Sequence, residues 1–371
     1  MLKVLQVINS LSSGGAEVFV SQLSVALSEK CDIKVLTYAG ELDEKGEYLK
    51  RYLLENGVQY TSLNKKNKFK RLLVPFRFAY EIIKWKPDII HVHLDRCEQF
   101  IYFANLFCLR KIIAVRTKHN SRGFSDNFIN KLLNGFYVKN IACSNASLTP
   151  LIESGLKDKT VLIENGIDVS CCQHLNSADK DLLRLKLGLP KNKIILLHIG
   201  SMHGEIATSP KAHDIILKAL SLYKNNNNYD VIFLGGGDNL NNLKHLASNL
   251  ELENIVSFKG IVPNVQDYLN CADIFILPSR WEGLPISAIE AACSGLPMIL
   301  SDIAPFTEFE SKSVTKCDVD SPESLANSIN LMVSNLDDFK NHALNALDKN
   351  KSKYSIKSVA EKHIALYQSL L

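Results

Sequence analysis

The sequence has no run of the roughly 18 to 20 apolar residues that a membrane-spanning helix needs. The nearest candidate, residues 100–109, contains Asn105 and is followed by Arg110 and Lys111. The apolar run at the N-terminus is too short for a signal peptide, and we expect it to form a first strand. These features favour a soluble, globular, cytoplasmic protein.

The sequence also lacks the cysteine and histidine spacings that are typical of metal and redox sites. The nine cysteines are odd in number and include no Cys-x-x-Cys pair, which favours reduced thiols, and we interpret the adjacent Cys171 and Cys172 as accidental. Asp318 and Asp320 match an Asp-x-Asp metal motif, but Asp320 precedes Ser-Pro-Glu at a predicted helix start, where capping explains it better. Four histidines show no ligand spacing: His198, His203, His213 and His245.

The net charge is only +4, but it is unevenly distributed. Residues 1–120 contain 19 Lys and Arg against 12 Asp and Glu. The excess centres on residues 65–78, here called the basic segment, which either lies on an anionic membrane surface or forms a solvated helix face. No nucleic-acid reader motif accompanies it, so nucleic acid is not an expected partner. Its basic and apolar members are Lys65, Lys66, Lys68, Lys70, Arg71 and Arg77, with Phe69, Leu72, Leu73, Phe76 and Phe78.

Short apolar runs alternate with helical patterns along the chain, which favours parallel sheets in an α/β architecture. The pattern predicts two doubly wound units in series, joined by a polar link at residues 168–190. In the first half we expect strands at 3–8, 32–37, 89–93, 111–117, 140–144 and 160–164. In the second half we expect strands at 193–199, 230–234, 255–259, 273–277 and 297–301.

The most informative segment runs from Pro278 to Glu290, with the sequence PSRWEGLPISAIE. It predicts a loop and then a short helix beginning at Leu284-Pro285, because proline suits the first helical position. Glu282 and Glu290 lie on either side of this start. Unpaired N–H groups and the helix dipole make such a start a site for anions. The segment therefore predicts a diphosphate site with an acid gripping a sugar on each side.

Several more motifs accompany this segment in a fixed order. Together they resemble the retaining glycosyltransferases of family 4, which have the GT-B fold, and the resemblance spans nearly the whole chain. The motifs are Gly14-Gly-Ala-Glu17, Pro87-Asp-Ile-Ile-His-Val-His93, Val115-Arg-Thr-Lys-His119, Ala142-Cys-Ser144, Glu164-Asn-Gly-Ile-Asp168, Lys211-Ala-His-Asp214, Leu234-Gly-Gly-Gly237 and Val256-Ser-Phe-Lys-Gly260.

The resemblance implies two Rossmann-like domains facing a central cleft. We expect an acceptor domain at residues 1–170, with a C-terminal helix at 355–371 packed back on it, and a nucleotide-sugar domain at 171–354. The implied donor is a UDP- or GDP-linked sugar, and no cofactor or metal is expected. The implied acceptor is a saccharide or lipid-linked saccharide, in polysaccharide or lipopolysaccharide assembly at the cytoplasmic face of the inner membrane.

The resemblance also assigns roles to particular residues. Glu290 is expected to bind the ribose and Glu282 the transferred sugar, while the amides of Gly283 and Leu284 hold the distal phosphate. Lys211 neutralises the leaving diphosphate, and His119 lies at the anomeric side of the donor sugar. Backbone that approaches the phosphates or lines the nucleotide side is expected at Gly14, Gly15, Gly200, Ser201, Gly235, Gly237, Gly260 and Ile261.

Two departures from the family pattern stand out. Ser201 occupies the place of a common arginine, and Arg280 or His203 could compensate for it. Leu284-Pro285 replaces the more frequent Phe-Gly.

Acceptor contacts are expected from Asp95, Arg96, Arg116, Asn120 and Arg122. His91 and His93 share one strand face, and we favour a core role for His91 and a pocket role for His93.

We expect front-face transfer with retention, in which the departing diphosphate accepts the acceptor's proton. Three alternatives stay open to test. A glycoside hydrolase would need Glu282 and Glu290 about 5–9.5 Å apart, whereas eight residues of mostly helical path span roughly 12 Å. A nucleotide-sugar epimerase would rearrange the donor alone. A non-catalytic subunit would bind the donor without turnover.

Overall fold

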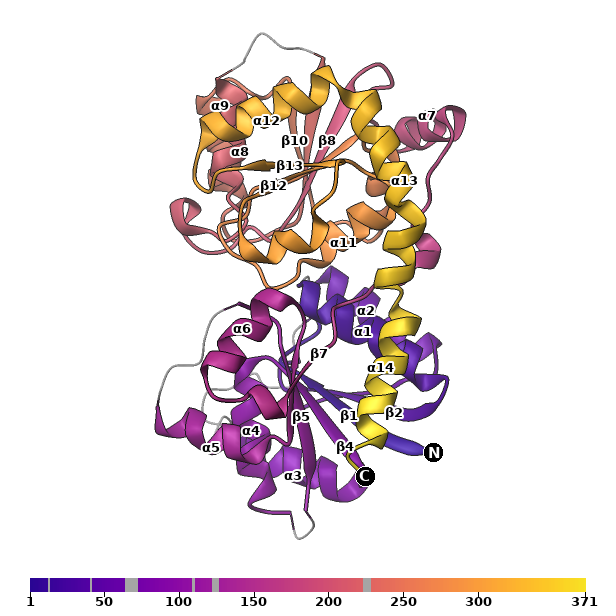
Figure 1. The fold of residues 1–371 in the computed structure, drawn as a ribbon, viewed down its shortest axis with the longest axis vertical. Coiled ribbons are helices and arrows are strands. Elements are labelled where there is room, and N and C mark those ends of the chain that lie inside the picture. The colour runs from indigo at the N-terminus through magenta and orange to yellow at the C-terminus, as the bar shows by residue number, and fades with distance from the viewer. Residues whose placement is uncertain (13, 41, 64–72, 109–110, 122–126, 223–227) are drawn as a thin grey trace. The chain divides into compact units, whose positions relative to one another are not determined.

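The structure is a computed structural model that describes residues 1–371 except 13, 41, 64–72, 109–110, 122–126 and 223–227. The chain divides into two compact units (Figure 1). The first unit comprises residues 1–167 and 355–371, and the second comprises residues 168–354. Most of the basic segment and Arg122 lie outside the described residues, whereas Arg77 belongs to a helix.

The first unit is built on a seven-stranded parallel sheet with the order β3-β2-β1-β4-β5-β6-β7. Its strands are β1 Leu2–Ile8, β2 Cys31–Thr37, β3 Gln59–Ser62, β4 Ile89–His93, β5 Ile113–Lys118, β6 Lys139–Ala142 and β7 Thr160–Leu162. Its α-helices are α1 Gly15–Ser28, α2 Glu44–Glu55, α3 Val74–Trp85, α4 Asp95–Asn105, α5 Phe128–Phe136, α6 Asn145–Glu153 and α14 Ile356–Gln368, with a 3-10 helix η2 at Lys157–Lys159.

The second unit is built on a six-stranded parallel sheet with the order β10-β9-β8-β11-β12-β13. Its strands are β8 Ile194–Ile199, β9 Tyr229–Leu234, β10 Val256–Gly260, β11 Ile274–Leu277, β12 Met298–Ser301 and β13 Val314–Cys317. Its α-helices are α7 Ser177–Lys186, α8 His213–Ser221, α9 Leu240–Asn249, α10 Val265–Cys271, α11 Ile286–Cys293, α12 Pro322–Ser334 and α13 Leu336–Tyr354, with 3-10 helices η3 Val169–Cys171, η4 Ile206–Thr208 and η5 Ala304–Phe309.

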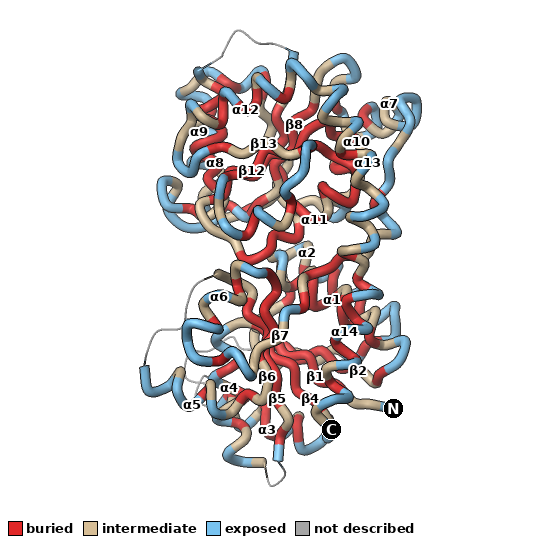
Figure 2. Tube along the Cα trace, in the orientation of Figure 1, coloured by how far each residue is buried: buried red, intermediate tan, exposed pale blue. Residues whose placement is uncertain are grey.

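Both sheets are doubly wound, which confirms the predicted α/β architecture. Parallel strands covered on both faces read as continuous apolar runs, and β11 with its fully buried Ile-Phe-Ile-Leu shows this. Figure 2 shows buried residues concentrated along the strands of each sheet. In β1 the register to β4 pairs Val4 with Ile89 and Val7 with Val92, which brings β1 and β4 side by side at the centre of the first sheet.

The eleven predicted strands are present, with ends that differ by one or two residues. Two strands were missed, β3 and β13. Both are edge strands of four residues, and β3 has the polar sequence Gln-Tyr-Thr-Ser, so neither produces an apolar run. The expected link at 168–190 is partly wrong, because residues 177–186 form α7, capped by the Asn176 side chain on the Asp179 amide.

The last helix, α14, packs on α1 of the first unit. The Ile356 amide donates to the Ile167 carbonyl at 2.8 Å, next to the point where the chain leaves the first unit. Val359, His363 and Tyr367 are buried on its inner face. The helix therefore completes the core of a unit whose other elements lie almost 200 residues earlier in the chain.

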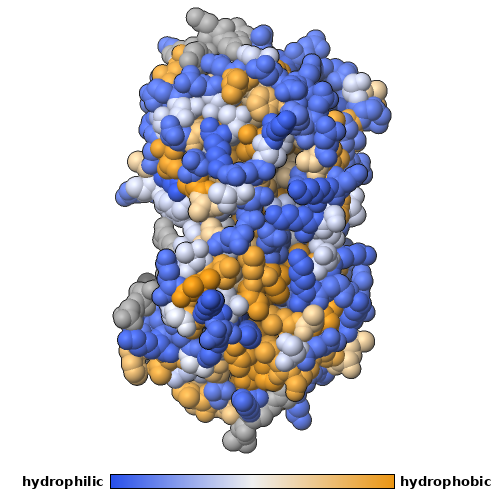
Figure 3. All heavy atoms as spheres, viewed as in Figure 1, coloured by the Kyte–Doolittle hydropathy of each residue, from blue (hydrophilic) through white to orange (hydrophobic). Residues whose placement is uncertain are grey.

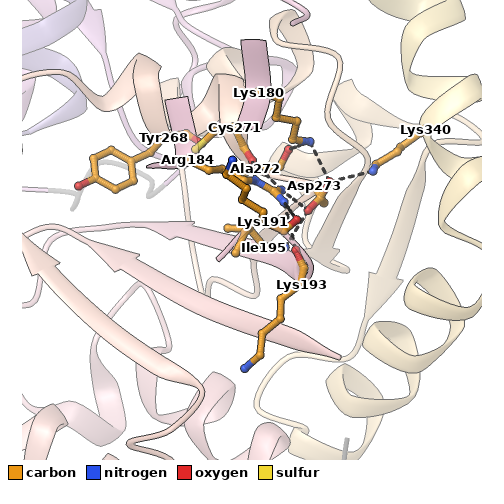
Figure 4. Close-up of polar contacts among 10 residues, drawn as sticks. All are labelled: Lys180, Arg184, Lys191, Lys193, Ile195, Tyr268, Cys271, Ala272, Asp273 and Lys340. Atoms are coloured by element: carbon orange, nitrogen blue, oxygen red, sulfur yellow. Dashed lines mark hydrogen bonds and ion pairs between the residues drawn. The ribbon is translucent and has the colours of Figure 1, made fainter. Parts of the chain in front are cut away.

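A buried carboxylate, Asp273, fastens the second unit just before β11 (Figure 4). Its Oδ2 accepts from the Arg184 guanidinium at 2.5 Å and from the Ile195 amide at 2.8 Å. Its Oδ1 accepts from Lys180 and Lys340, each at 2.8 Å. Burial alone would raise the pKa of Asp273, but the three cations hold it well below its ordinary value. This carboxylate joins α7, β8 and α13, and a cavity of about 380 Å³ opens beside it.

Candidate functional site

The loop between β11 and α11 carries the predicted diphosphate site. The helix begins at Ile286, with Pro285 as its N-cap in an extended conformation, so the predicted start at Leu284-Pro285 is one to two residues early. Gly283 and Leu284 are buried at this start. The first N–H groups of any α-helix have no partner within the helix, and those of Ile286 and Ser287 belong to this class. The segment thus has the local form that an anion site requires.

Lys211 and Glu282 meet at this loop as a close ion pair. The Lys211 ammonium lies 2.5 Å from Glu282 Oε1, and the side chains are only 19% and 11% exposed. The Ser279 hydroxyl donates to the same carboxylate oxygen at 2.7 Å. The structure therefore brings together the two residues to which the family pattern gives the phosphate and the sugar. Their charges balance each other, so an arriving diphosphate would compete with Glu282 for the ammonium.

Glycines bring the loops after β8 and β9 into backbone contact. At Gly235, which has φ +130°, a Cβ would lie 2.0 Å from the Gly200 carbonyl oxygen. At Gly237, a Cβ would lie 2.2 Å from the Met202 carbonyl oxygen. A Cβ at Gly200 would lie 2.9 Å from Lys211 Cγ. These glycines are required by the approach of the loops to one another and to Lys211, whatever they bind.

The remaining residues expected on the nucleotide side lie around the same loops. The Gly235 amide donates to the Gly260 carbonyl at 2.8 Å, and Ile261 packs against Gly236, where a Cβ would lie 2.9 Å from its Cγ1. Ser201 is exposed. Glu290 is half-buried within α11. Its charge adds to burial in raising the pKa of Cys293 to about 12.

The two candidates for replacing the absent arginine differ in their surroundings. Arg280 is 8% exposed and is bound by Asp214 at 3.1 Å, Asp320 at 2.6 Å and the Ser209 carbonyl at 2.8 Å. These three contacts explain Arg280 as part of the fold. His203 is exposed and pairs with Asp238 at 2.9 Å.

The Asp-x-Asp motif has a structural explanation as well. Asp320 has φ +58° and binds Arg280, while the helix α12 is capped by Ser321, which accepts from the Ser324 amide at 3.1 Å. The capping role thus belongs to the residue after Asp320. Within the described ranges, no group of three or more His, Cys, Asp or Glu side chains could hold a metal ion.

In the first unit, His119 follows β5 and lies against a buried histidine. Its Nε2 is 2.9 Å from His93 Nδ1, and His93 Nε2 is 2.8 Å from Gln6 Oε1. His93 is fully buried, so the pocket role expected for it is wrong; its contact with the half-buried His119 is a hydrogen bond. Burial is the main cause that lowers the pKa of His119 to about 4, although Asp95 opposes this shift. His119 is therefore a neutral imidazole at physiological pH.

His91 has the core role predicted for it. It is fully buried, and its ring nitrogens lie 2.7 Å from Tyr367 Oη and 2.7 Å from Thr117 Oγ1. Burial lowers its pKa well below the ordinary value. Gln6 and Tyr367 were missed by sequence reasoning, because a glutamine inside a strand and a tyrosine on a terminal helix carry no motif of their own.

The glycine motif before α1 makes room for its own glutamate. A Cβ at Gly14 would lie 2.2 Å from Glu17 Oε2, while Gly15 is exposed as the first residue of the helix. Burial is the main cause that raises the pKa of Glu17 to about 7. The geometry thus explains Gly14 by an intramolecular contact. The approach of a phosphate to Gly14 and Gly15 stays a prediction.

Among the expected acceptor contacts, Arg116 is a clear correction. It is 2% exposed and binds Glu98 at 2.6 Å, Asn140 at 2.7 Å and Asn134 at 2.5 Å, with its guanidinium over the Tyr137 ring. It cannot reach a substrate. Other candidates are accessible to different degrees: Asp95 and Arg96 are exposed, and Asn120 is half-buried.

Comparison with known proteins identifies the family. The model of the glycosyl transferases group 1 matches residues 179–351, and the model of glycosyltransferase family 4 matches residues 13–170. The chain belongs to glycosyltransferase family 4. The group 1 match lies within the second unit, and the family 4 match covers the first unit from residue 13 and ends three residues into the second.

Two curated relatives come from Escherichia coli. One is a UDP-Gal:alpha-D-GlcNAc-diphosphoundecaprenol alpha-1,3-galactosyltransferase, 29% identical over 39% of this chain and 37% of its own length. The other is the O-antigen biosynthesis glycosyltransferase WbnH, 24% identical over 78% of both chains. The chain spans at most 61% of the length of several further similar relatives.

A solved structure, Anabaena HepE in complex with UDP-glucose, matches over the full length of both chains with a TM-score of 0.85 and 20% identity. At that identity the likeness shows the fold, which is GT-B. Within the described part of the chain, no helix is both long and apolar enough to cross a bilayer.

Proposed function

We propose that this protein transfers a sugar from a nucleoside-diphosphate sugar to an acceptor hydroxyl, with retention of the anomeric configuration and without a metal. The observation that carries this proposal is the half-buried Lys211–Glu282 pair beside the start of α11. It combines a cation and an N-terminal helix end, which bind phosphate, with a carboxylate that binds sugar hydroxyls. We propose a UDP- or GDP-linked sugar as the donor, and HepE, which was solved with UDP-glucose, supports a nucleotide-sugar donor.

In the proposed reaction, the bond from the anomeric carbon to the diphosphate oxygen breaks while a bond to the acceptor oxygen forms on the same face. The leaving diphosphate takes the proton of the acceptor hydroxyl. Lys211 and the amides at the start of α11 stabilise the charge that develops on it. Glu282, released from Lys211, accepts hydrogen bonds from hydroxyls of the transferred sugar, and Glu290 does the same for the ribose.

We propose a saccharide or lipid-linked saccharide as the acceptor, in the assembly of a cell-surface polysaccharide or lipopolysaccharide. The names of the galactosyltransferase and WbnH support this assignment. A lipid-linked acceptor would bring a cytoplasmic enzyme to the inner face of the membrane.

The surface of the first unit supports peripheral membrane contact. Figure 3 shows hydrophobic side chains exposed over part of the first unit. α3 and α4 pack together, and each exposes large apolar residues at its outer side or just beyond its end. The rings of Phe76 and Phe107 lie 4.3 Å apart. The exposed set on these two helices and the turn after α4 is Phe76, Tyr80, Ile83, Phe103, Leu106 and Phe107.

A donor screen followed by a turnover assay tests the proposal. Thermal shift against a panel of nucleotide sugars selects the donor, and release of nucleoside diphosphate is then measured with and without saccharide acceptors. Acceptor-dependent release with the α or β configuration of the donor kept in the product supports retaining transfer. Rearranged donor in the absence of acceptor would favour the epimerase, and binding without turnover would favour a non-catalytic subunit.

A further inference from the structure

A continuous chain of hydrogen bonds runs through the interior of the first unit and ends at His119. It links side chains from β1, β4, β5 and α14, with successive distances of 2.7, 2.7, 3.5, 2.8 and 2.9 Å. Its members in order are Thr117, His91, Tyr367, Gln6, His93 and His119. Four of them, Gln6, His91, His93 and Tyr367, have no exposed surface, so they exchange hydrogen bonds with one another.

Gln6 sets the direction of the chain toward His119. A carboxamide accepts on Oε1 and donates from Nε2. Oε1 faces His93 Nε2 at 2.8 Å, so this ring nitrogen carries the proton. Nδ1 of the neutral His93 is then an acceptor, and it accepts a hydrogen bond from the Nε2–H of His119 at 2.9 Å. The remaining nitrogen of His119, Nδ1, is left with a lone pair.

Tyr367 holds the carboxamide in this orientation from the other side. Gln6 Nε2 donates to Tyr367 Oη at 3.5 Å, and the tyrosine hydroxyl then donates to His91 Nδ1 at 2.7 Å. The Nε2–H of His91 donates a hydrogen bond to Thr117 Oγ1 at 2.7 Å. In this arrangement each of the five hydrogen bonds has one donor and one acceptor. A neutral network suits this buried position, because an isolated buried charge is costly.

The surroundings of the two outer histidines keep them uncharged. The titratable groups that influence His119 are Asp95, His363 and Lys118, of which only Asp95 favours the charged form. His93 lies among His91, His119 and His363, all of which disfavour its charged form. His119 is half-buried, and its Nδ1 has no protein hydrogen-bond partner within the described ranges.

We propose that Gln6 and Tyr367 are positioning residues that hold His119 as the neutral Nε2–H tautomer, so that Nδ1 accepts a hydrogen bond from a sugar hydroxyl. This rests on the proposed transfer reaction. Since Tyr367 comes from α14, 361 residues after Gln6, the terminal helix supplies part of the machinery that prepares His119. A histidine in the other tautomer would present N–H and would select a different substrate atom.

The tautomer is measurable in the full-length protein without any substrate. Ring ¹⁵N chemical shifts of ¹⁵N-histidine-labelled protein, assigned with His93→Gln and His119→Gln variants, distinguish protonated from unprotonated ring nitrogens. We expect Nε2–H for both residues at pH 7. A dominant Nδ1–H tautomer at His119, or an even mixture, would overturn the proposal. This readout stands even when no donor or acceptor has been found, so its failure and that of the proposed function are separable.

Two variants of similar length separate positioning from packing. Gln6→Met removes both hydrogen bonds, whereas Gln6→Glu keeps the acceptor toward His93. We expect Gln6→Met to mix the tautomers of His119 and to lower kcat/KM about tenfold, the effect of one neutral hydrogen bond. Gln6→Glu keeps the Nε2–H tautomer and more of the activity, with the acid limb of the pH profile moved to higher pH by the added carboxylate.

Tyr367→Phe tests the other end of the carboxamide. It removes the hydroxyl that accepts from Gln6, and we expect a mixed tautomer at His119 with an unchanged fold by circular dichroism. Wild-type tautomer populations in both Gln6→Met and Tyr367→Phe would contradict the proposal. So would equal losses of activity in Gln6→Met and Gln6→Glu, because that result would assign Gln6 to packing alone.

Discussion

The candidate site of the first unit and that of the second unit differ in the charge of their side chains. In the second unit, Lys211 and Glu282 form a half-buried ion pair, and Arg280 is bound by Asp214 and Asp320. In the first unit, His119 ends a network of neutral side chains. Charges suit a diphosphate, whose own charge changes during transfer, whereas neutral acceptors suit sugar hydroxyls. Under the proposed function, the second unit would bind the anionic part of the donor and the first unit would bind hydroxyls.

The largest expected effect concerns the stability of the second unit, which contains Asp273. Asp273→Asn leaves Lys180, Arg184 and Lys340 without their shared carboxylate. Removal of one partner from a buried ion pair typically costs about 3–5 kcal/mol. We expect a loss of this order in urea unfolding followed at pH 7, with Asp302→Asn, an exposed partner of Lys316, as the control. An unchanged urea midpoint in Asp273→Asn would show that this carboxylate contributes little to the stability of the fold.

The same variant has a defined pH signature. The pKa of Asp273 is depressed in the folded state, so its stabilisation is complete above the unfolded-state pKa and disappears as pH falls through the folded value. The wild type therefore loses this contribution at strongly acidic pH, and Asp273→Asn shows a shallower acid dependence below about pH 4.

The next largest effect tests the role of Lys211 in the candidate site of the second unit. Lys211→Ala removes the cation beside α11, and loss of one preorganised charge contact costs on the order of 10²–10³ in kcat. Lys218→Ala, on the exposed side of the adjacent helix α8, serves as the matched control and retains activity. Steady-state kinetics with the selected donor measure both. A Lys211→Ala enzyme with wild-type kcat would end the assignment of Lys211 to the leaving group.

A smaller effect concerns His363, a buried histidine whose ring packs near those of His91 and Tyr367. Burial lowers the pKa of His363 to about 4, whereas an unfolded histidine titrates near 6.5. The unfolded chain then binds more protons between these values, so stability falls as pH drops from 7 to 5, by about 2 kcal/mol for this residue. His363→Phe should flatten this pH dependence in unfolding experiments. An equally steep profile in the variant would show that His363 has the same pKa in the folded and unfolded protein.

The smallest effect concerns the exposed pair of His203 and Asp238, whose side chains are 66% and 72% exposed. Surface ion pairs contribute about 0–1 kcal/mol. We expect His203→Ala to leave donor KM within about threefold of wild type. A rise in donor KM of tenfold or more would instead assign His203 the cationic role of the absent arginine. The candidate site of the second unit would then include the loop after β8.

Sequence reasoning performed best where local chemistry is strong. The apolar runs of β4 and β11 predicted these strands, and the Pro278 to Glu290 segment predicted the loop and helix that follow β11. It performed worst where long-range contacts decide. Arg116 looks like a substrate contact in the sequence, but Glu98, Asn134 and Asn140 enclose it. The contact between His93 and His119 could not be predicted either, since β4 and the end of β5 become neighbours only in the folded sheet.

The sequence by itself determined the two parallel sheets, the family and the residue types at the edge of the second sheet, because hydrophobic periodicity and glycine-rich loops act over short distances. Only the tertiary structure decided which charges pair, which histidines are buried and which side chain His119 is hydrogen-bonded to. These properties depend on burial and on partners such as Tyr367, which reaches Gln6 only once α14 has packed on the first unit.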